Sequence, residues 1–320
     1  MNVLKELENI GIIPVVCIEN ADDAVSLAGA LLKGGISAAE VTFRTDAAEE
    51  AIKRMSQAFP EMVVGAGTVL TIEQAQRAVN AGSRFIVSPG FNPKVVKWCV
   101  ENDVAVIPGC TTPSEIEQAI ELGLDTVKFF PAEQSGGLPK IKALAAPYVN
   151  MKFMPTGGIN LANMNEYLAF KKIIACGGSF MVSGELLKNK DWDKVTALSK
   201  EAVRTMLGLK IRHIGINSEN DETAKTTADL FANLLGIDEC DELSGSYFAG
   251  DEFEIMKSCG KGKCGHIAIG ANNVERAVYY LRRRGFKFLD DTAAYDDNGN
   301  LKFIYLDADF GGFAVHLTKN

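Results

Sequence analysis

Short hydrophobic stretches alternate with amphipathic segments along the first part of the chain, at a pitch of roughly 20 to 25 residues between residue 12 and about residue 180. This alternation of strand and helix signals is typical of a parallel sheet. The eight strand-like stretches are IIPVVCI (12–18), AEVTF (39–43), MVVGAG (62–67), RFIVS (84–88), VAVIPG (104–109), TVKFF (126–130), KFMPTG (152–157) and IIACGG (173–178). Eight such units that close on themselves predict a (β/α)8 TIM barrel, and an open doubly wound sheet is the alternative.

The pattern changes near residue 208, after a long amphipathic segment that begins at Gly184. Strand, helix and strand signals then occur twice in the same order. They are KIRHIGIN, DETAKTTADLFANLLG and EFEIMK in the first half, and CGHIAIG, NVERAVYYLRRRG and FAVHLTK in the second. Two such halves, packed side by side, would bury apolar surface that one half alone would leave exposed. The sequence therefore predicts a barrel over residues 1–207 and a smaller α+β domain of paired βαβββ modules over residues 210–320.

Composition favours a small-molecule enzyme. The chain has 320 residues, of which 47% are hydrophobic, and this is enough for two cores. A net charge of −8 without any Lys/Arg-rich block argues against nucleic acid or an anionic membrane as the main partner. No apolar run approaches the ~20 residues that a membrane span requires. We therefore expect a small-molecule substrate, and neither a nucleic acid nor a membrane partner.

Cysteine usage bears on the compartment. The seven cysteines are odd in number and scattered, and the N-terminal sequence MNVLKELENIG lacks the basic-then-apolar form of a signal peptide. We expect a reduced, cytoplasmic protein.

Polar residues occur where the predicted strands end, which is where barrels of parallel strands collect their chemistry. Glu40, Thr42 and Arg44 share one face of the second strand by alternation. Thr68 follows the third strand, and Lys128 lies in the middle of the sixth. A carboxylate, a guanidinium group and an amine are therefore expected to converge on one cavity.

Lys128 suggests a covalent mechanism. A lysine held in an apolar pocket beside a cation such as Arg44 loses its proton more easily and becomes a nucleophile toward carbonyl groups. Attack on a 2-oxo acid gives an iminium ion that permits cleavage of the C3–C4 bond. Glu40 would act as general base and acid, and Arg44 would clamp the substrate carboxylate. The alternative is that Lys128 and Glu40 form only a buried structural ion pair.

Glycine pairs end the last two strands. Gly157 and Gly158 follow the seventh strand, and Gly177 and Gly178 are followed by Ser179. Barrels commonly hold phosphate after strands 7 and 8, where backbone N–H groups can approach an anion. Tight turns are the alternative explanation.

Six motifs occur in order: EVTFRT, GAGTVL, SPGFN, KFFPAE, PTGGI and CGGSF. With them, residues 1 to about 207 resemble the 2-dehydro-3-deoxy-6-phosphogluconate (KDPG) and 4-hydroxy-2-oxoglutarate (KHG) aldolase family of class I lyases. The resemblance implies cleavage of KDPG to pyruvate and glyceraldehyde 3-phosphate, or of KHG to pyruvate and glyoxylate, by a homotrimer that needs no cofactor.

The family resemblance also implies residue roles. Lys128 would be the Schiff-base lysine, and Glu40 the general acid and base working through water. The implied substrate contacts are Arg44 and Thr68 at the pyruvate carboxylate, Pro89 and Phe130 as apolar walls, and Gly157, Gly158 and Ser179 at a distal phosphate.

The only three histidines of the chain all fall in the second half. His213 and His266 open equivalent strands of the two repeats, and Glu254 and His316 occupy equivalent places in the closing strands. Three imidazoles and a carboxylate suit a divalent metal such as Zn, Ni, Fe or Mn. The loop Cys259 to Cys264 is a rival metal site, but a C-x4-C pair without a second pair is a weak signal.

Residues 210–320 resemble the vicinal oxygen chelate superfamily, which includes glyoxalase I and bleomycin-resistance proteins. In glyoxalase-like members the four corresponding positions hold His, Glu, His and Glu. The pattern carries over to His213, Glu254 and His266, whereas His316 replaces the last Glu. Two alternatives are that this domain serves only for assembly or binding, and that the chain is a metal-dependent small-molecule binding protein with the barrel as scaffold.

Overall fold

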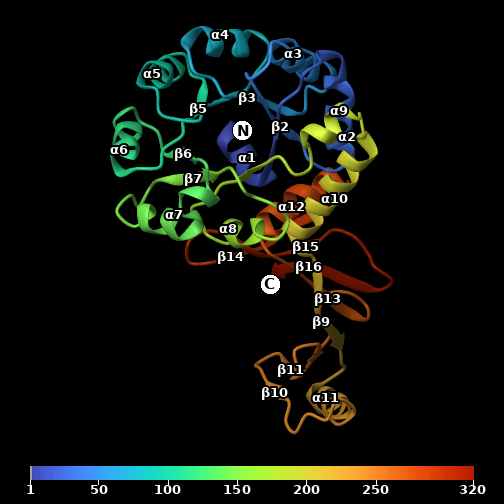
Figure 1. Cartoon of the computed structure of the whole chain (residues 1–320). Coiled ribbons are helices and arrows are strands. Elements are labelled where there is room, and N and C mark those ends of the chain that lie inside the picture. Colours follow the sequence, from blue (N-terminus) through green and yellow to red (C-terminus); the bar gives the residue numbers. More distant parts are fainter. Residues whose placement is uncertain (1) are drawn as a thin grey trace. The chain divides into compact units, whose positions relative to one another are not determined.

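The computed structural model describes residues 2–320. The chain divides into two compact units, the first ending at Met206 and the second spanning Leu207–Asn320. The first unit is a ring of helices around strands, and the second consists mostly of strands (Figure 1).

Eight parallel strands form the centre of the first unit. They are β1 (Ile12–Val16), β2 (Ala38–Thr42), β3 (Val63–Gly67), β4 (Phe85–Val87), β5 (Ala105–Ile107), β6 (Thr126–Phe129), β7 (Lys152–Pro155) and β8 (Cys176–Gly178). Six of them pair in the order β5-β4-β3-β2-β1-β8, and β6 pairs with β7. Isolated parallel bridges from Gly109 to Lys128 and from Thr156 to Gly177 connect these two sheets. The predicted parallel α/β architecture is therefore confirmed, and each strand has a neighbour on both sides.

Helices surround these strands. They are α1 (Val3–Ile10), α2 (Ala24–Lys33), α3 (Ala48–Ala58), α4 (Ile72–Asn80), α5 (Pro93–Glu101), α6 (Pro113–Glu121), α7 (Gly137–Ala145), α8 (Met164–Leu168), α9 (Gly184–Lys188) and α10 (Trp192–Leu207), with the 3-10 helices η1 (Ala21–Asp23) and η2 (Glu133–Ser135). Their starts follow the expected capping chemistry. Thr71 caps α4, and Thr112 forms a reciprocal capping box with Glu115 at the start of α6.

Helix α1 covers the amino-terminal ends of the strands. Its carboxylates pair with residues at these ends, because Glu6 lies 2.8 Å from Arg84, just before β4, and Glu8 lies 3.5 Å from Lys152, the first residue of β7. Leu7 is fully buried beneath the helix. The carboxyl ends, where the polar residues of the sequence motifs follow the strands, are the opposite ends.

The second unit repeats one order of elements, strand, helix and three strands. The first set is β9 (Lys210–Asn217), α11 (Asp221–Leu235), β10 (Asp241–Glu242), β11 (Ser246–Ala249) and β12 (Phe253–Met256), and the second is β13 (Gly265–Ala271), α12 (Val274–Arg283), β14 (Phe288–Tyr295), β15 (Leu301–Leu306) and β16 (Phe313–Lys319). The strands form one sheet in the order β10-β11-β12-β9-β13-β16-β15-β14. The first strands of the two sets, β9 and β13, are therefore neighbours at its centre.

One face of this sheet is covered by helices. Helix α11 packs on β11 and β12, where Ala224, Ala228, Tyr247 and Ile255 form a buried cluster. Helix α12 packs on β15 and β16. Since the side chains of a strand alternate between faces, every second residue of the central strands points away from the helices.

The sequence pattern gave residue ranges for six of these ten elements. The predicted βαβββ order implied further strands but gave no ranges for β10, β11, β14 and β15. Strand β10 has only two residues, and both are exposed. The pairing of β14 with β15 shifts register between Leu289 and Ala294, which breaks the period of two on which strand prediction depends. In the first unit the eighth strand begins at Cys176, three residues later than predicted.

Within residues 2–320, no helix combines the length and the apolar character needed to cross a membrane.

Candidate functional site

A buried ion pair lies at the centre of the first unit. The Nζ of Lys128, on β6, donates a hydrogen bond to Oε1 of Glu40, on β2, over 3.1 Å. The two side chains are only 6% and 1% exposed. The second oxygen of Glu40, Oε2, is also buried and has no hydrogen-bond partner within the described chain. A buried carboxylate oxygen normally has a hydrogen-bond partner, which can be a protein group or an ordered water molecule.

The position of Glu40 requires a glycine on the neighbouring strand. Gly67, at the end of β3, lies opposite Thr42 in the sheet. A Cβ atom at residue 67 would lie 2.2 Å from Glu40 Oε1 and 2.8 Å from its Cδ. Only a residue without a side chain leaves room for the carboxylate to reach Lys128.

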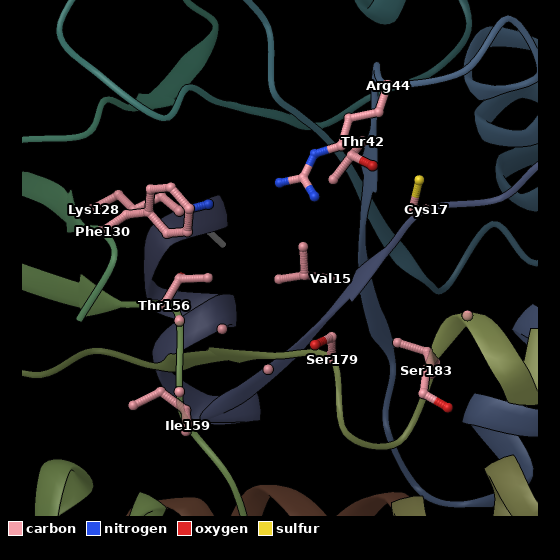
Figure 2. Close-up of a pocket in the computed structure, with 16 residues that line it drawn as sticks. Val15, Cys17, Thr42, Arg44, Lys128, Phe130, Thr156, Ile159, Ser179 and Ser183 are labelled. Carbon is pink, nitrogen blue, oxygen red and sulfur yellow. The ribbon is translucent and has the colours of Figure 1, made fainter. Parts of the chain in front are cut away.

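Lys128 lines a cavity of about 360 Å³, and Glu40 contacts Lys128 without lining this cavity itself. Residues from several strand ends line it, including Arg44, Lys128, Phe130, Gly157, Gly158 and Ser179. In Figure 2 the side chains of Arg44 and Lys128 extend toward each other from opposite walls of this cavity. The Nζ of Lys128 also lies 5.4 Å from the centre of the Phe130 ring. The cavity thus brings together six of the nine residues that were predicted to have catalytic or substrate-binding roles.

Thr68 contributes through Arg44. Its hydroxyl accepts a hydrogen bond from Nε of Arg44 over 3.1 Å. The backbone of Thr68 has a φ of 55°, in the left-handed region that a β-branched residue rarely adopts. Such outliers persist where the surrounding structure imposes them, often at functional sites. Thr68 and Pro89 are not among the cavity-lining residues of the described chain.

Sequence reasoning missed part of the cavity wall. Thr156 lines the cavity, and its buried Oγ1 has no hydrogen-bond partner in residues 2–320. Cys17 lines it as well. So does Thr42, which was predicted on the same strand face as Glu40 but was given no role. Thr156 precedes the PTGG glycines, and Cys17 has no polar pattern around it that could have marked it.

A hydrogen bond behind the glycine loop was missed too. The hydroxyl of Tyr167, on α8, donates to Oε1 of Glu133, on η2. Burial and the Glu133 carboxylate raise the pKa of Tyr167 well above its usual range. The Glu133 backbone N–H donates to the carbonyl of Gly157 over 3.1 Å. Tyr167 and Glu133 thus brace the loop that carries Gly157 and Gly158.

The second unit contains a cluster of imidazoles on the face of its sheet opposite the helices. His213 on β9 lies opposite Ala268 on β13, and Ala268 lies opposite His316 on β16. The rings of His213 and His316 have their centres 5.7 Å apart, with the small Ala268 between them. Their donor atoms, together with that of His266, lie within 4.8 Å of one another.

The next row of the same face completes the cluster. Gly215 on β9 lies between Glu254 on β12 and His266 on β13. A Cβ atom at Gly215 would lie 2.1 Å from the His266 ring, so the glycine leaves space for this imidazole. The sheet therefore places all four predicted metal ligands side by side.

The donor atoms of three of these residues are closely spaced. Nε2 of His213 lies 3.1 Å from Nε2 of His266, and Oε2 of Glu254 lies 3.2 Å and 3.0 Å from these two nitrogens. These three contacts cannot all be hydrogen bonds. In the contact between the two imidazoles one nitrogen must accept, and a ring nitrogen that accepts a hydrogen bond has no proton to donate to Glu254. Ligands at about 2.1 Å from one divalent cation are about 3 Å apart when they are at right angles, so the spacing fits a metal.

Charge within the cluster is consistent with cation binding. Burial would raise the pKa of Glu254, but hydrogen bonds from His213, His266 and Ser246 outweigh it and lower this pKa well below the usual range. Burial and the neighbouring imidazoles lower the pKa of His316 to about 4. An ionised carboxylate beside a neutral imidazole is the protonation state that metals require of their ligands. Cys259 and Cys264 are exposed and lie outside this cluster.

Comparison with known proteins places the first unit in a family. The sequence matches the aldolase family described as KDPG and KHG aldolase over residues 3–198. The chain belongs to this family. A 2-dehydro-3-deoxy-phosphogluconate aldolase of Treponema pallidum (strain Nichols) is 50% identical over 204 residues, which cover 64% of this chain and 97% of the relative. A KHG/KDPG aldolase of Escherichia coli (strain K12) is 41% identical over 192 residues, which cover 60% of this chain and 90% of the relative.

Solved structures agree. The KDPG aldolase of Zymomonas mobilis ZM4, crystallised with 3-phosphoglycerate, superposes with a TM-score of 0.60 at 40% sequence identity. The superposed region covers 63% of this chain and 95% of the Zymomonas chain. The Legionella pneumophila KDPG aldolase, with pyruvate captured as a covalent carbinolamine, superposes with a TM-score of 0.60 at 38% sequence identity. The superposed region covers 62% of this chain and 97% of the Legionella chain. The predicted family, lyase class and aldolase-type function of the N-terminal part are confirmed.

The close approach of Gly67 to Glu40 predicts an effect on aldol cleavage. Gly67→Ala should lower kcat by about tenfold to a hundredfold, because the new methyl group displaces the carboxylate from Lys128. Steady-state kinetics measures this. Gly29→Ala is the matched control, since a Cβ there meets its nearest atom at 3.6 Å. Unchanged kcat in a folded Gly67→Ala enzyme would contradict the role given to this glycine.

Proposed function

We propose that the first unit is a (β/α)8 barrel that works as a class I pyruvate aldolase, cleaving KDPG to pyruvate and glyceraldehyde 3-phosphate, KHG to pyruvate and glyoxylate, or both. The observation that carries the proposal is the buried contact of 3.1 Å between Glu40 and Lys128, whose side chain lines the cavity together with Arg44.

The reaction follows from these two side chains. Lys128 passes its proton to Glu40 and attacks the C2 carbonyl of the substrate with the free amine. Glu40 returns this proton as the carbinolamine loses water, which gives an iminium ion. Glu40 then takes the proton of the C4 hydroxyl, through a water molecule, while the C3–C4 bonding electrons move toward the iminium nitrogen. The aldehyde leaves and an enamine remains. Glu40 returns its proton to C3, and hydrolysis releases pyruvate and free Lys128.

The other cavity residues would each contact a different part of the substrate. Arg44, oriented by the Thr68 hydroxyl, would hold the pyruvate carboxylate. Phe130 lines the cavity beside Lys128 and would form an apolar wall. Gly157, Gly158 and Ser179 would receive the distal phosphate through backbone N–H groups and a hydroxyl. The reaction needs no cofactor, because the iminium ion itself accepts the electrons.

Trapping the covalent intermediate tests the nucleophile. Sodium borohydride added with pyruvate should reduce the iminium ion and fix the pyruvyl group on Lys128, as peptide mass spectrometry would detect. Lys128→Met should lose the adduct and several orders of magnitude in kcat. The matched control is Lys152→Met, on β7, whose side chain is 43% exposed. Absence of an adduct on Lys128 would favour the alternative in which the barrel is a scaffold.

The phosphate end is tested by substrate comparison. Ser179→Glu places a carboxylate at the proposed phosphate position, so KM for KDPG should rise about tenfold to a hundredfold. KM for KHG, which has no phosphate, should change much less. Ser179→Ala controls for loss of the hydroxyl alone. Equal losses on both substrates would show that the phosphate binds elsewhere.

For the second unit we propose a vicinal oxygen chelate-like domain over residues 210–320, made of two βαβββ modules that hold a divalent metal at His213, Glu254, His266 and His316. The repeated element order and the neighbouring positions of β9 and β13 support the modules. The donor spacing of 3.0 to 3.2 Å supports the ligands. A bound Zn, Ni, Fe or Mn ion would polarise a substrate oxygen.

Metal content tests this second proposal. The chain purified without chelators and supplied with Mn²⁺ should hold about one metal ion per chain by elemental analysis, and His213→Ala/His266→Ala should hold almost none. Glu252→Ala is the matched control, because Glu252 is exposed and two residues from Glu254. Stoichiometric metal in the double variant would rule out this ligand set.

The homotrimer expected for the family stays a prediction.

A further inference from the structure

The sheet face that carries the histidine cluster continues into a second cavity. Along one row, Tyr305 on β15 lies opposite His316, and Leu289 on β14 lies opposite Tyr305. Along the next row, Ala314 on β16 lies opposite His266. Directly paired residues of a sheet point to the same face. Leu289, Tyr305 and Ala314 therefore extend the face of the cluster toward one edge of the sheet.

These three residues line a cavity of about 370 Å³. This volume lies in the range of small-molecule sites, roughly 300 to 1,000 Å³. Tyr305 connects the cavity to the cluster, because its ring centre lies 5.1 Å from that of His316. The four residues of the cluster do not line the cavity, so a ligand in it would have to extend past the Tyr305 ring to reach the imidazoles.

Two lysines from the loop between β12 and β13 also line this cavity, Lys261 and Lys263. Nζ of Lys261 lies 5.4 Å from the centre of the Tyr305 ring. The cavity also has two carboxylates, Asp307 and Asp309. One oxygen of Asp309 accepts the backbone N–H of Gly312 over 2.6 Å, which fixes the orientation of this carboxylate.

The loop that carries the lysines is fixed in place. Asn217, at the end of β9, holds it with both ends of its side-chain amide. Its Oδ1 accepts the N–H of Gly260 over 3.0 Å, and its Nδ2 donates to the carbonyl of Gly262 over 2.9 Å. The N–H of Cys264 donates to the carbonyl of Gly312 over 2.8 Å. A loop anchored in this way holds its charges in position before a ligand arrives.

We propose that this cavity binds a small hydroxylated acid with two anionic ends. One end, a carboxylate with an adjacent oxygen, would lie at the histidine cluster, and the other, a phosphate or second carboxylate, would lie at Lys261 and Lys263. Asp307 would accept hydrogen bonds from ligand hydroxyls. The proposal rests on the metal site proposed above and adds its ligand class. This is also the chemical class of the proposed aldolase substrates, so the second unit would bind an acid of the kind that enters or leaves that reaction.

Binding of 3-phosphoglycerate tests the proposal, because this probe has a carboxylate with an adjacent hydroxyl at one end and a phosphate at the other. Isothermal titration into the full-length, Mn²⁺-supplied chain would compare the wild type with Lys261→Gln/Lys263→Gln and Lys261→Glu/Lys263→Glu. The binding component of the second unit should weaken at least about tenfold in the charge-reversed variant and less in the neutral one. Any difference in affinity between the variants arises in the second unit, because the first unit is the same in all of them.

The control is Lys302→Glu, an exposed lysine that alternation places on the other face of β15 from Tyr305. Its affinity for the probe should equal that of the wild type. Equal affinities in all variants, or an equal loss in Lys302→Glu, would overturn the proposal. Metal content of the same samples separates the two proposals. Absence of metal from the Mn²⁺-supplied chain would contradict the metal site, whereas lysine-dependent binding to that chain would still support the cavity.

Discussion

The first unit depends on the burial of one ammonium group against one carboxylate. Removing two charges from water costs several kcal/mol for each ion, and their attraction recovers this only when the geometry is close. The contact between Lys128 and Glu40 meets this condition at 3.1 Å with both side chains almost fully buried. The arrangement also constrains residues around it, since β3 must end in glycine so that the carboxylate can reach across the strands. Stability does not explain such a pair, because apolar side chains would fill the same space at similar or lower free energy.

The same steric principle governs the second unit. Four polar side chains come together because the residues between them are small, Ala268 in one row and Gly215 in the next. With larger residues at these two positions, the imidazoles would be pushed apart and their nitrogens could not lie within 5 Å of one another. Both units therefore build a polar centre on rigid strands and make room for it with small neighbours. Strands position side chains more precisely than loops, which suits catalysis and metal binding alike.

Sequence periodicity was enough to place the eight strands of the first unit, because parallel strands buried on both faces form short apolar runs. It also placed Lys128, Glu40 and Arg44 on faces that converge, and it matched the histidines of the two repeats. Other features depend on contacts between residues far apart in sequence. The need for Gly67 and Gly215, the left-handed backbone of Thr68 and the bond between Tyr167 and Glu133 leave no periodic signal. Strands β14 and β15 were given no residue ranges because their pairing is irregular.

The central claim is that Lys128 forms the iminium ion and Glu40 moves the proton at C3. Exchange of the pyruvate methyl protons in D2O, followed by ¹H NMR, tests both parts in one measurement. The wild type should exchange them, Lys128→Met should not, and Glu40→Gln should exchange them about a hundredfold to ten-thousandfold more slowly. Exchange that persists in Lys128→Met, or that proceeds at the wild-type rate in Glu40→Gln, would contradict this account.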